Sequence, residues 1–293
     1  MSSPGVADLA VVTNRSAGRG RADEVAARLR RAAETAGHVV VELAADDAAS
    51  TRSAVADLPA GVRRVVAVGG DGLTHHVVQH LAGTDVGLGL VPVGTGNDFA
   101  AALGLPHDSD RAIETALGPT RRIDAIETTH GWAASVATIG FSGDVNARAD
   151  GLPLGLGSVR YSVATVLELP RLRVRRLTVR LDDGDPIGIE TVMLAVANTA
   201  RFGGGMLVCP DARPDDGLLD VTSVGPVSRT KLLRVFPKIF RGEHVHEPEV
   251  TTWRAARVEL SDGVDLWADG ERMGPSPITL HVVPGALHIA APA

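Results

Sequence analysis

The sequence predicts two domains: an α/β domain with a parallel sheet covered by helices over residues 1–125, and a mainly antiparallel β-sandwich over residues 126–293. Three observations carry this prediction. Short apolar runs alternate with helical stretches up to about residue 125, and β-like runs spaced by Gly, Pro and Asp follow. The length of 293 residues also exceeds what one small core needs.

The first half contains four strand-like runs, three of which end in a glycine-bearing loop. Strand–helix alternation is typical of a parallel sheet, in which the loops at the carboxyl ends of the strands form the site. We expect strands at 7–12, 38–43, 63–68 and 86–91, with helices at 22–36, from about 50 to 56, and from the glycine loop after the third strand to about Leu81.

The second half has the texture of an antiparallel sandwich, because its apolar runs are short and turn residues separate them. Two helices are predicted there, at 158–169 and 228–240. We expect strands in the runs 132–139, 177–181, 189–197, 218–224, 256–260 and 278–283.

The composition narrows the classes of function. A net charge of −6 argues against binding nucleic acid, and a single cysteine, Cys209, excludes a disulfide within the chain. The N-terminus lacks the basic region of a signal peptide, and no apolar run approaches the ~20 residues that span a bilayer. We therefore expect a cytoplasmic protein whose membrane contact, if any, is peripheral.

Three glycine loops follow predicted strands: Asn14–Gly20 (NRSAGRG), Gly69–Gly72 (GGDG) and Gly94–Asp98 (GTGND). Glycine lets backbone N–H groups approach phosphate oxygens, and the next helix N-terminus favours the negative charge. One such loop is as readily a plain turn, whereas three at successive strand ends indicate a phosphate site. Neither the P-loop nor the dinucleotide fingerprint is present.

The chain resembles the soluble diacylglycerol kinase and sphingosine kinase superfamily of lipid kinases. The resemblance rests on NRSAGRG, VGGDGLTHHV, PVGTGNDFA, the stretch FGGGMLVCPDARPDDGLLDV after Asn198, and WADGERM with the Pro-rich strand pair that follows it. It implies a phosphofructokinase- and NAD-kinase-like nucleotide domain, a β-sandwich, and an active site in the cleft between them. It also implies ATP and Mg²⁺ as cofactors.

The resemblance assigns the nucleotide to the glycine loops and Mg²⁺ to carboxylates. Asp71 is expected to organise Mg²⁺–ATP, directly or through water, with Asp98 and Asp124 in the same network. Asp98 reads equally as a helix N-cap, and Asp124 as a strand-edge residue. The nucleotide ligands implied are Asn14, Gly69, Gly70, Gly72, Gly94, Thr95, Gly96 and Asn97.

For the general base the resemblance offers two candidates. Glu271 of the Asp-Gly-Glu motif is expected to take the proton from the lipid hydroxyl, while the sphingosine kinases point to Asp71 instead. Asp269-Gly270 is also a common hairpin turn pair. In PDDGLLD, Asp216 and the backbone at Leu218 either hold a structural Mg²⁺ or form an Asp-Gly turn.

The chain departs from the family pattern at two positions after Gly72. Leu73 stands where diacylglycerol kinases have Thr, and His76 stands where both groups have Glu. A neutral histidine cannot orient a nucleotide loop as an anion does. His75, His76 and His80 show no zinc-protease pattern, so we do not expect a metal there.

A lipid acceptor requires an interfacial surface, and residues 229–241 offer one. Lys231, Arg234, Lys238 and Arg241 share one side of a helical wheel in KLLRVFPKIFR. This pattern predicts peripheral contact with an anionic membrane, although a core-packed helix with a solvated face gives the same pattern and Pro237 would kink it. The sequence leaves a homodimer open.

Three functions remain on the sequence alone. The first is an ATP-dependent kinase that phosphorylates a hydroxyl of diacylglycerol or a sphingoid-type lipid. The second is an NAD-kinase-like enzyme with a soluble acceptor, against which the full GTGNDF loop argues. The third is a nucleotide-binding homologue without catalysis, against which the presence of Asp71, Asp98 and Glu271 together argues.

Overall fold

The computed structural model describes residues 7–14, 21–45, 47–94, 96–152 and 159–292. The chain divides into two compact units, Met1–Ile123 with Gly285–Ala293, and Asp124–Pro284. The sequence predicts that all of 126–293 belongs to the second domain, but residues 285–293 belong to the first unit. The path of the last strand explains this difference. This strand, β18 (Ile278–Ala290), begins in the second unit, and its end pairs in parallel with β4 of the first.

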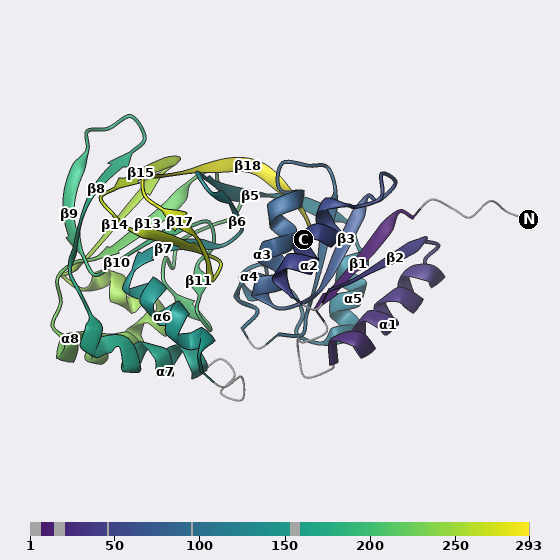
Figure 1. Cartoon of the computed structure of the whole chain (residues 1–293), viewed down its shortest axis with the longest axis horizontal. Helices are drawn as coiled ribbons and strands as arrows, with labels where there is room; N and C mark the ends of the chain where they lie inside the picture. The colour runs from purple at the N-terminus through teal and green to yellow at the C-terminus, as the bar shows by residue number, and fades with distance from the viewer. Residues whose placement is uncertain (1–6, 15–20, 46, 95, 153–158, 293) are drawn as a thin grey trace, which may run out of the picture. The chain divides into compact units, whose positions relative to one another are not determined.

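The first unit is built on a parallel sheet in the order β2-β1-β3-β4, followed by the end of β18 (Figure 1). The predicted α/β class with a parallel sheet is confirmed. Its strands are β1 (Leu9–Asn14), β2 (Val40–Ala45), β3 (Arg64–Gly69) and β4 (Gly87–Pro92). Its helices are α1 (Arg21–Thr35), α2 (Ala48–Ala56), α3 (Asp71–Leu81), α4 (Asp98–Ala102) and α5 (Ser109–Leu117).

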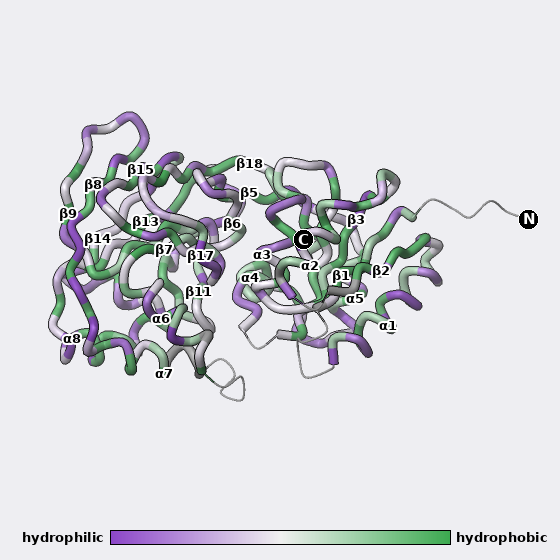
Figure 2. Tube along the Cα trace, in the orientation of Figure 1, coloured by the Kyte–Doolittle hydropathy of each residue, from purple (hydrophilic) through white to green (hydrophobic). Residues whose placement is uncertain are grey.

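The core of this unit lies between the sheet and two helices. In Figure 2 α1 alternates between hydrophilic and hydrophobic residues, and its apolar side packs on the strands together with α5. The buried cluster consists of Leu9, Val11, Val25, Ala26, Leu29, Ala33, Val66, Val68, Val91, Ala112, Ile113 and Ala116. Burial of these strands explains their continuous apolar runs, which are typical of parallel sheets.

The second unit contains two antiparallel sheets, as the sandwich prediction requires. One has the order β14-β13-β10-β7-β16-β17, and the other runs β18-β15-β8-β9, with β5 beside β18 and β6 beside β5. The first sheet is formed by β7 (Val136–Gly140), β10 (Met193–Ala197), β13 (Leu219–Val224), β14 (Val250–Ala255), β16 (Asp265–Ala268) and β17 (Glu271–Pro275). The second adds β5 (Thr120–Thr128), β6 (Gly131–Ala133), β8 (Arg175–Leu181), β9 (Ile187–Thr191) and β15 (Arg257–Ser261), and a small pair joins β11 (Arg201–Phe202) to β12 (Met206–Leu207).

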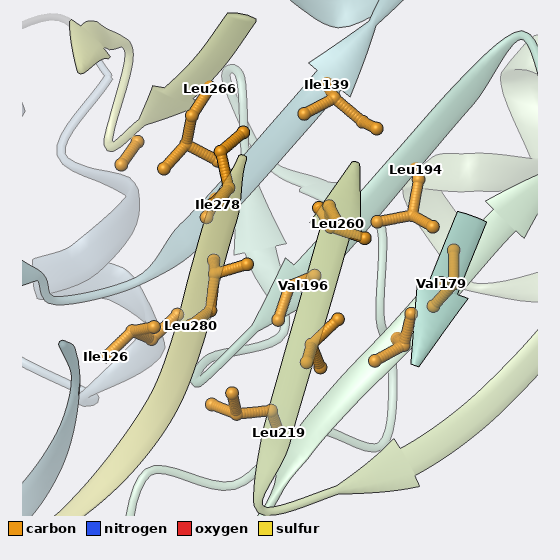
Figure 3. Close-up of a cluster of buried hydrophobic side chains, with 14 of the residues drawn as sticks. Ile126, Ile139, Val179, Leu194, Val196, Leu219, Leu260, Leu266, Ile278 and Leu280 are labelled. Atoms are coloured by element: carbon orange, nitrogen blue, oxygen red, sulfur yellow. The ribbon is translucent and has the colours of Figure 1, made fainter. Parts of the chain in front are cut away.

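Side chains from both sheets meet in one hydrophobic cluster, which Figure 3 shows in close-up. Leu194 from β10 and Leu260 from β15 are almost fully buried there. Alternate residues of each strand supply the cluster, because successive side chains of a strand point to opposite faces. The two sheets are therefore held together by ordinary sandwich packing.

The helices of the second unit differ from the prediction in two places. The predicted helix 228–240 is α8 (Arg229–Val235) followed by a 3-10 helix, η4 (Phe236–Arg241), because Pro237 has no N–H to continue α-helical bonding. Helix α6 (Phe141–Asp150) was not predicted, since Gly143 weakens its helical signal. A Cβ on Gly143 would lie 2.6 Å from the Trp267 ring.

The remaining helical segments are α7 (Val159–Glu168), η3 (Leu169–Arg171) and η5 (Glu243–His246). The predicted helix 158–169 thus corresponds to α7. In the part of the chain that the structure describes, no helix has both the length and the apolar character needed to cross a bilayer.

Candidate active site

Two glycine loops meet at the carboxyl end of the parallel sheet in the first unit. Strand β3 ends at Gly69, and Gly70 caps α3, whose first residue is Asp71. The Gly70 and Gly94 backbones pass so close that a Cβ on Gly94 would lie 2.7 Å from the Gly70 Cα. Side chains are therefore excluded at this crossing, which explains the glycines in both loops.

The Asp71 carboxylate links the start of α3 to the start of α4. Its Oδ2 accepts a hydrogen bond from the Asp98 amide at 3.1 Å, and its Oδ1 accepts one from the Phe99 amide at 3.2 Å. Asp71 thus binds two of the amides at the start of α4 that have no partner within the helix. The reading of Asp98 as the N-cap is wrong, because α4 begins at Asp98 and its N-cap is Asn97, whose side chain makes no capping bond.

Asn97 is held in a left-handed conformation beside these loops, with φ 56° and ψ 38°. Its Nδ2 donates to the Gly94 carbonyl at 2.8 Å. Its Oδ1 is buried and has no hydrogen-bond partner among the described residues. The side chain lines a small pocket with Gly69, Gly70 and Asp71. A buried acceptor without a donor suits a ligand group that donates a hydrogen bond.

Most of the predicted nucleotide residues therefore lie together in the first unit. Gly69, Gly70, Gly72, Asp71, Gly94, Gly96, Asn97 and Asp98 all belong to the two loops and the helices that follow them. Thr95 and residues 15–20 lie outside the described residues. Asn14 is the last residue of β1, and its side chain also lies outside the description.

Asp124 belongs to the second unit, whereas Asp71 and Asp98, the other two carboxylates of the predicted magnesium network, belong to the first. Its Oδ2 accepts a hydrogen bond from the Gly217 amide at 2.8 Å, and its backbone carbonyl accepts one from Asn198 Nδ2, also at 2.8 Å. Asn198 is fully buried and donates a further bond to the Ala134 carbonyl at 3.0 Å. These bonds thus join four segments of the second unit, around residues 124, 134, 198 and 217.

The carboxylate of Asp216 already has a cationic partner. Its Oδ1 accepts a hydrogen bond from the Leu218 amide at 3.1 Å, and Arg254 pairs with its other oxygen. Arg254 also reaches Asp220 at 3.4 Å. Burial raises the pKa of Asp220, and the Arg254 charge opposes that rise. Within the described residues no three His, Cys, Asp or Glu side chains are grouped as a metal site, so the structural Mg²⁺ stays a prediction.

Glu271 begins β17, directly after a tight turn whose two residues, Asp269 and Gly270, have φ of 52° and 93°. The Asp269 carboxylate anchors this turn, accepting bonds from the Ala134 amide at 2.9 Å and from the Ser135 amide and hydroxyl at 2.9 and 2.6 Å. Sequence reasoning missed this anchor, although the Asp-Gly pair signals the turn. The Asp269 bonds therefore hold the turn that directly precedes the half-buried Glu271.

His76 is buried within α3 and does not line the pocket beside Asp71. Its ring meets that of His75 edge-on at 5.3 Å between centroids, and its Nδ1 has no partner among the described residues. Burial, with the charges of His75, Arg52 and His80, lowers the pKa of His76 to about 4. The departure from the family pattern thus places a neutral side chain in the packing of α3.

This burial makes the stability of the protein depend on pH. Between pH 6.5 and about 4 the unfolded chain binds a proton at His76 that the folded chain does not. We expect the free energy of unfolding to fall by on the order of 3 kcal/mol as the pH drops through that range. Urea denaturation of the wild type and of His76→Gln at several pH values measures this, and equal slopes in both proteins would contradict it.

Comparisons with known proteins identify the family. The model of the "Diacylglycerol kinase catalytic domain" matches residues 8–128, and that of the "YegS C-terminal NAD kinase beta sandwich-like domain" matches residues 134–291. A protein of Mycobacterium tuberculosis named "Diacylglycerol kinase" is 38% identical over 98% of this chain and 96% of its own length.

Solved structures share the fold at low identity. The crystal structure of a diacylglycerol kinase from Bacillus anthracis superposes with a TM-score of 0.73 and 16% identity, covering 97% of both chains. An NAD kinase from Archaeoglobus fulgidus, solved in complex with ATP, gives a TM-score of 0.52 and 14% identity over 96% of this chain and 92% of its own. With both family domains present in order, this chain belongs to the diacylglycerol kinase family.

Proposed function

We propose that the protein is an ATP-dependent lipid kinase that transfers the γ-phosphate of ATP to a hydroxyl of diacylglycerol or of a sphingoid-type lipid. The observation that carries the proposal is the geometry around Asp71. Its carboxylate and the Oδ1 of Asn97, which has no partner among the described residues, stand among glycines at the carboxyl ends of β3 and β4. Ligands of parallel α/β sheets bind at this edge, and family membership supports kinase chemistry there.

The residues at this edge fit a magnesium–nucleotide complex. Asp71 and Asp98 supply two carboxylates, and Mg²⁺ in kinases is commonly held by one or two carboxylates, waters and the phosphates themselves. We infer that Asp71 and Asp98 hold the ion and that the backbone amides of the glycine loops hold the phosphates. Bound there, Mg²⁺ would neutralise the charge that develops on the transferred group.

Glu271 is the proposed general base. Within the described residues its carboxylate has no hydrogen bond or ion pair, so it is available to accept a proton from an incoming hydroxyl. The Asp269 anchor fixes the turn from which Glu271 projects. Because Glu271 belongs to the second unit and Asp71 to the first, the proposed reaction requires both units to act on one pair of substrates.

A transfer assay with γ-labelled ATP tests the proposal against its alternatives. The acceptors are diacylglycerol and sphingosine in detergent micelles and NAD in solution, each tried with the wild type and with Asp71→Ala. We expect label in a lipid product with the wild type only. Label in NADP would favour the NAD-kinase-like function. ATP binding without transfer to any acceptor would favour a non-catalytic homologue.

A further inference from the structure

The basic residues of the segment 229–241 are mostly neutralised inside the second unit. Lys231 Nζ lies 2.6 Å from Glu249 Oε2, and Lys238 Nζ lies 2.7 Å from Glu247 Oε1. Arg241 pairs with Glu243 at 2.8 Å. Membrane contact through this segment stays a prediction, but three of the four cations on its predicted basic side are already paired. A stronger excess of positive charge lies elsewhere in the same unit.

A cavity of about 490 Å³ opens beside α6 and the segment that joins α7 to β8. Helices α6 and α7 pack side by side (Figure 1). Among the described residues, four arginines and two carboxylates line the cavity, and the other lining residues are Ala147, Gly151 and Leu152. The charged lining residues are Asp144, Arg148, Glu168, Arg171, Arg173 and Arg175. Two positive charges are therefore in excess on its wall.

Glu168 organises two of these arginines from below the surface. It is only 5% exposed, and its Oε1 accepts bonds from Arg148 Nε at 2.5 Å and Arg171 Nη1 at 3.0 Å. Burial alone would raise the pKa of Glu168, but the hydrogen bond and charge of Arg148 outweigh it and hold the pKa below its usual value. The carboxylate thus stays ionised and fixes two guanidinium groups in place, which reduces the cost of ordering them on a ligand.

The other two arginines leave charge available at the cavity. Arg175 pairs loosely with Asp144 at 3.4 Å. Arg173 is exposed and has no ion-pair partner among the described residues. Arginine is the side chain best suited to phosphate, because its planar N–H groups match two phosphate oxygens at once. The cavity therefore offers a preorganised site for an anion of that geometry.

Large apolar side chains are exposed beside this charge. Val166 and Leu167 precede Glu168 and are 52% and 46% exposed, and Val174 lies between Arg173 and Arg175 and is 50% exposed. Exposed apolar side chains add nothing to the binding of a soluble anion. They do contribute to binding a membrane surface, because apolar side chains enter the acyl boundary while arginines bind the headgroup layer. The combination favours a phosphate that belongs to a lipid.

We propose that this arginine cavity binds the phosphate group of an anionic phospholipid and so docks the second unit on the membrane surface. This inference goes beyond the proposed function, since the cavity shares no residue with the Asp71 loops or with Glu271. Its ligand is a membrane component and not the phosphoryl acceptor.

Arg173→Glu is the sharpest test, because Arg173 is exposed and unpaired within the described part of the chain and its replacement leaves the Glu168 contacts intact. Replacing Arg148 instead would strand a buried carboxylate. The full chain is sedimented with vesicles of phosphatidylglycerol and phosphatidylcholine, and with phosphatidylcholine alone. We expect the wild type to bind the anionic vesicles, and Arg173→Glu to bind about 30-fold more weakly, the effect of reversing one charge at an anionic surface.

Arg63→Glu in the first unit is the matched control, since Arg63 is also exposed and unpaired among the described residues. It should bind as the wild type does, and both variants should keep wild-type activity on micellar acceptor. Equal binding by Arg173→Glu and the wild type, or equal loss in Arg63→Glu, overturns the proposal. Calorimetric binding of glycerol phosphate without any vesicle binding would overturn the lipid as the source of the phosphate.

Discussion

Glu271→Gln is expected to lower kcat by about 10²- to 10⁴-fold, the usual contribution of a general base. Glutamine keeps the size of the side chain but cannot accept the proton from the acceptor hydroxyl. The turn before it should persist, because Asp269 and its bonds to Ala134 and Ser135 are untouched. The KM for ATP should therefore stay within about twofold, since the predicted nucleotide loops belong to the first unit.

The same hairpin provides a matched control in Asp265→Asn. Asp265 of β16 pairs with Arg272 of β17 at 2.9 Å, and both side chains are largely exposed. Such a pair contributes at most about 1 kcal/mol, so this variant should keep wild-type turnover. Steady-state kinetics on Glu271→Gln and Asp265→Asn test whether Glu271 is the general base. A fully active Glu271→Gln enzyme would move the role of base to Asp71.

The fold was predictable where the pattern of hydrophobic residues is regular. The parallel strands of the first unit are buried on both faces, and this gave the continuous apolar runs that located β1, β3 and β4. Periodicity failed where a tertiary contact dictates the residue. The Trp267 ring leaves no room for a side chain at position 143, and the glycine found there weakened the helical signal of α6. The path of β18 back into the first unit depends on pairing with β4, which no local pattern encodes.

The same distinction between local patterns and tertiary contacts applies to the residues of the candidate site. Glycine loops at strand ends located Asp71 and Asn97, because backbone crossings exclude side chains and leave a readable pattern. Hydrogen bonds between distant segments leave no such pattern in the sequence. Asp71 binds amides of α4 that lie 27 and 28 residues further along, and Asp269 binds amides about 135 residues earlier. The same limit applies to His76, whose burial depends on how α3 packs.

Asp71→Ala is expected to lower phosphoryl transfer by roughly 10³-fold or more, because positioning and charge neutralisation are most of what a kinase supplies. It should also cost about 1 kcal/mol of stability, since the amides of Asp98 and Phe99 lose their acceptor. Asp71→Asn separates the two effects. Its amide can accept from one of these N–H groups but presents its own N–H to the other, and it carries no charge for Mg²⁺.

A control variant for Asp71→Ala must lose a helix-capping side chain that is not a proposed ligand of Mg²⁺. Asp108 offers such a position. Asp108 caps α5 in the same unit, and its Oδ1 accepts a bond from the Arg111 amide at 3.1 Å. Asp108→Ala should cost about the same 1 kcal/mol and leave kcat unchanged. Thermal denaturation and turnover measured on all three variants resolve the roles. If Asp108→Ala and Asp71→Ala lost activity in proportion to stability alone, Asp71 would be a structural cap, and the proposed magnesium site would have lost its central ligand.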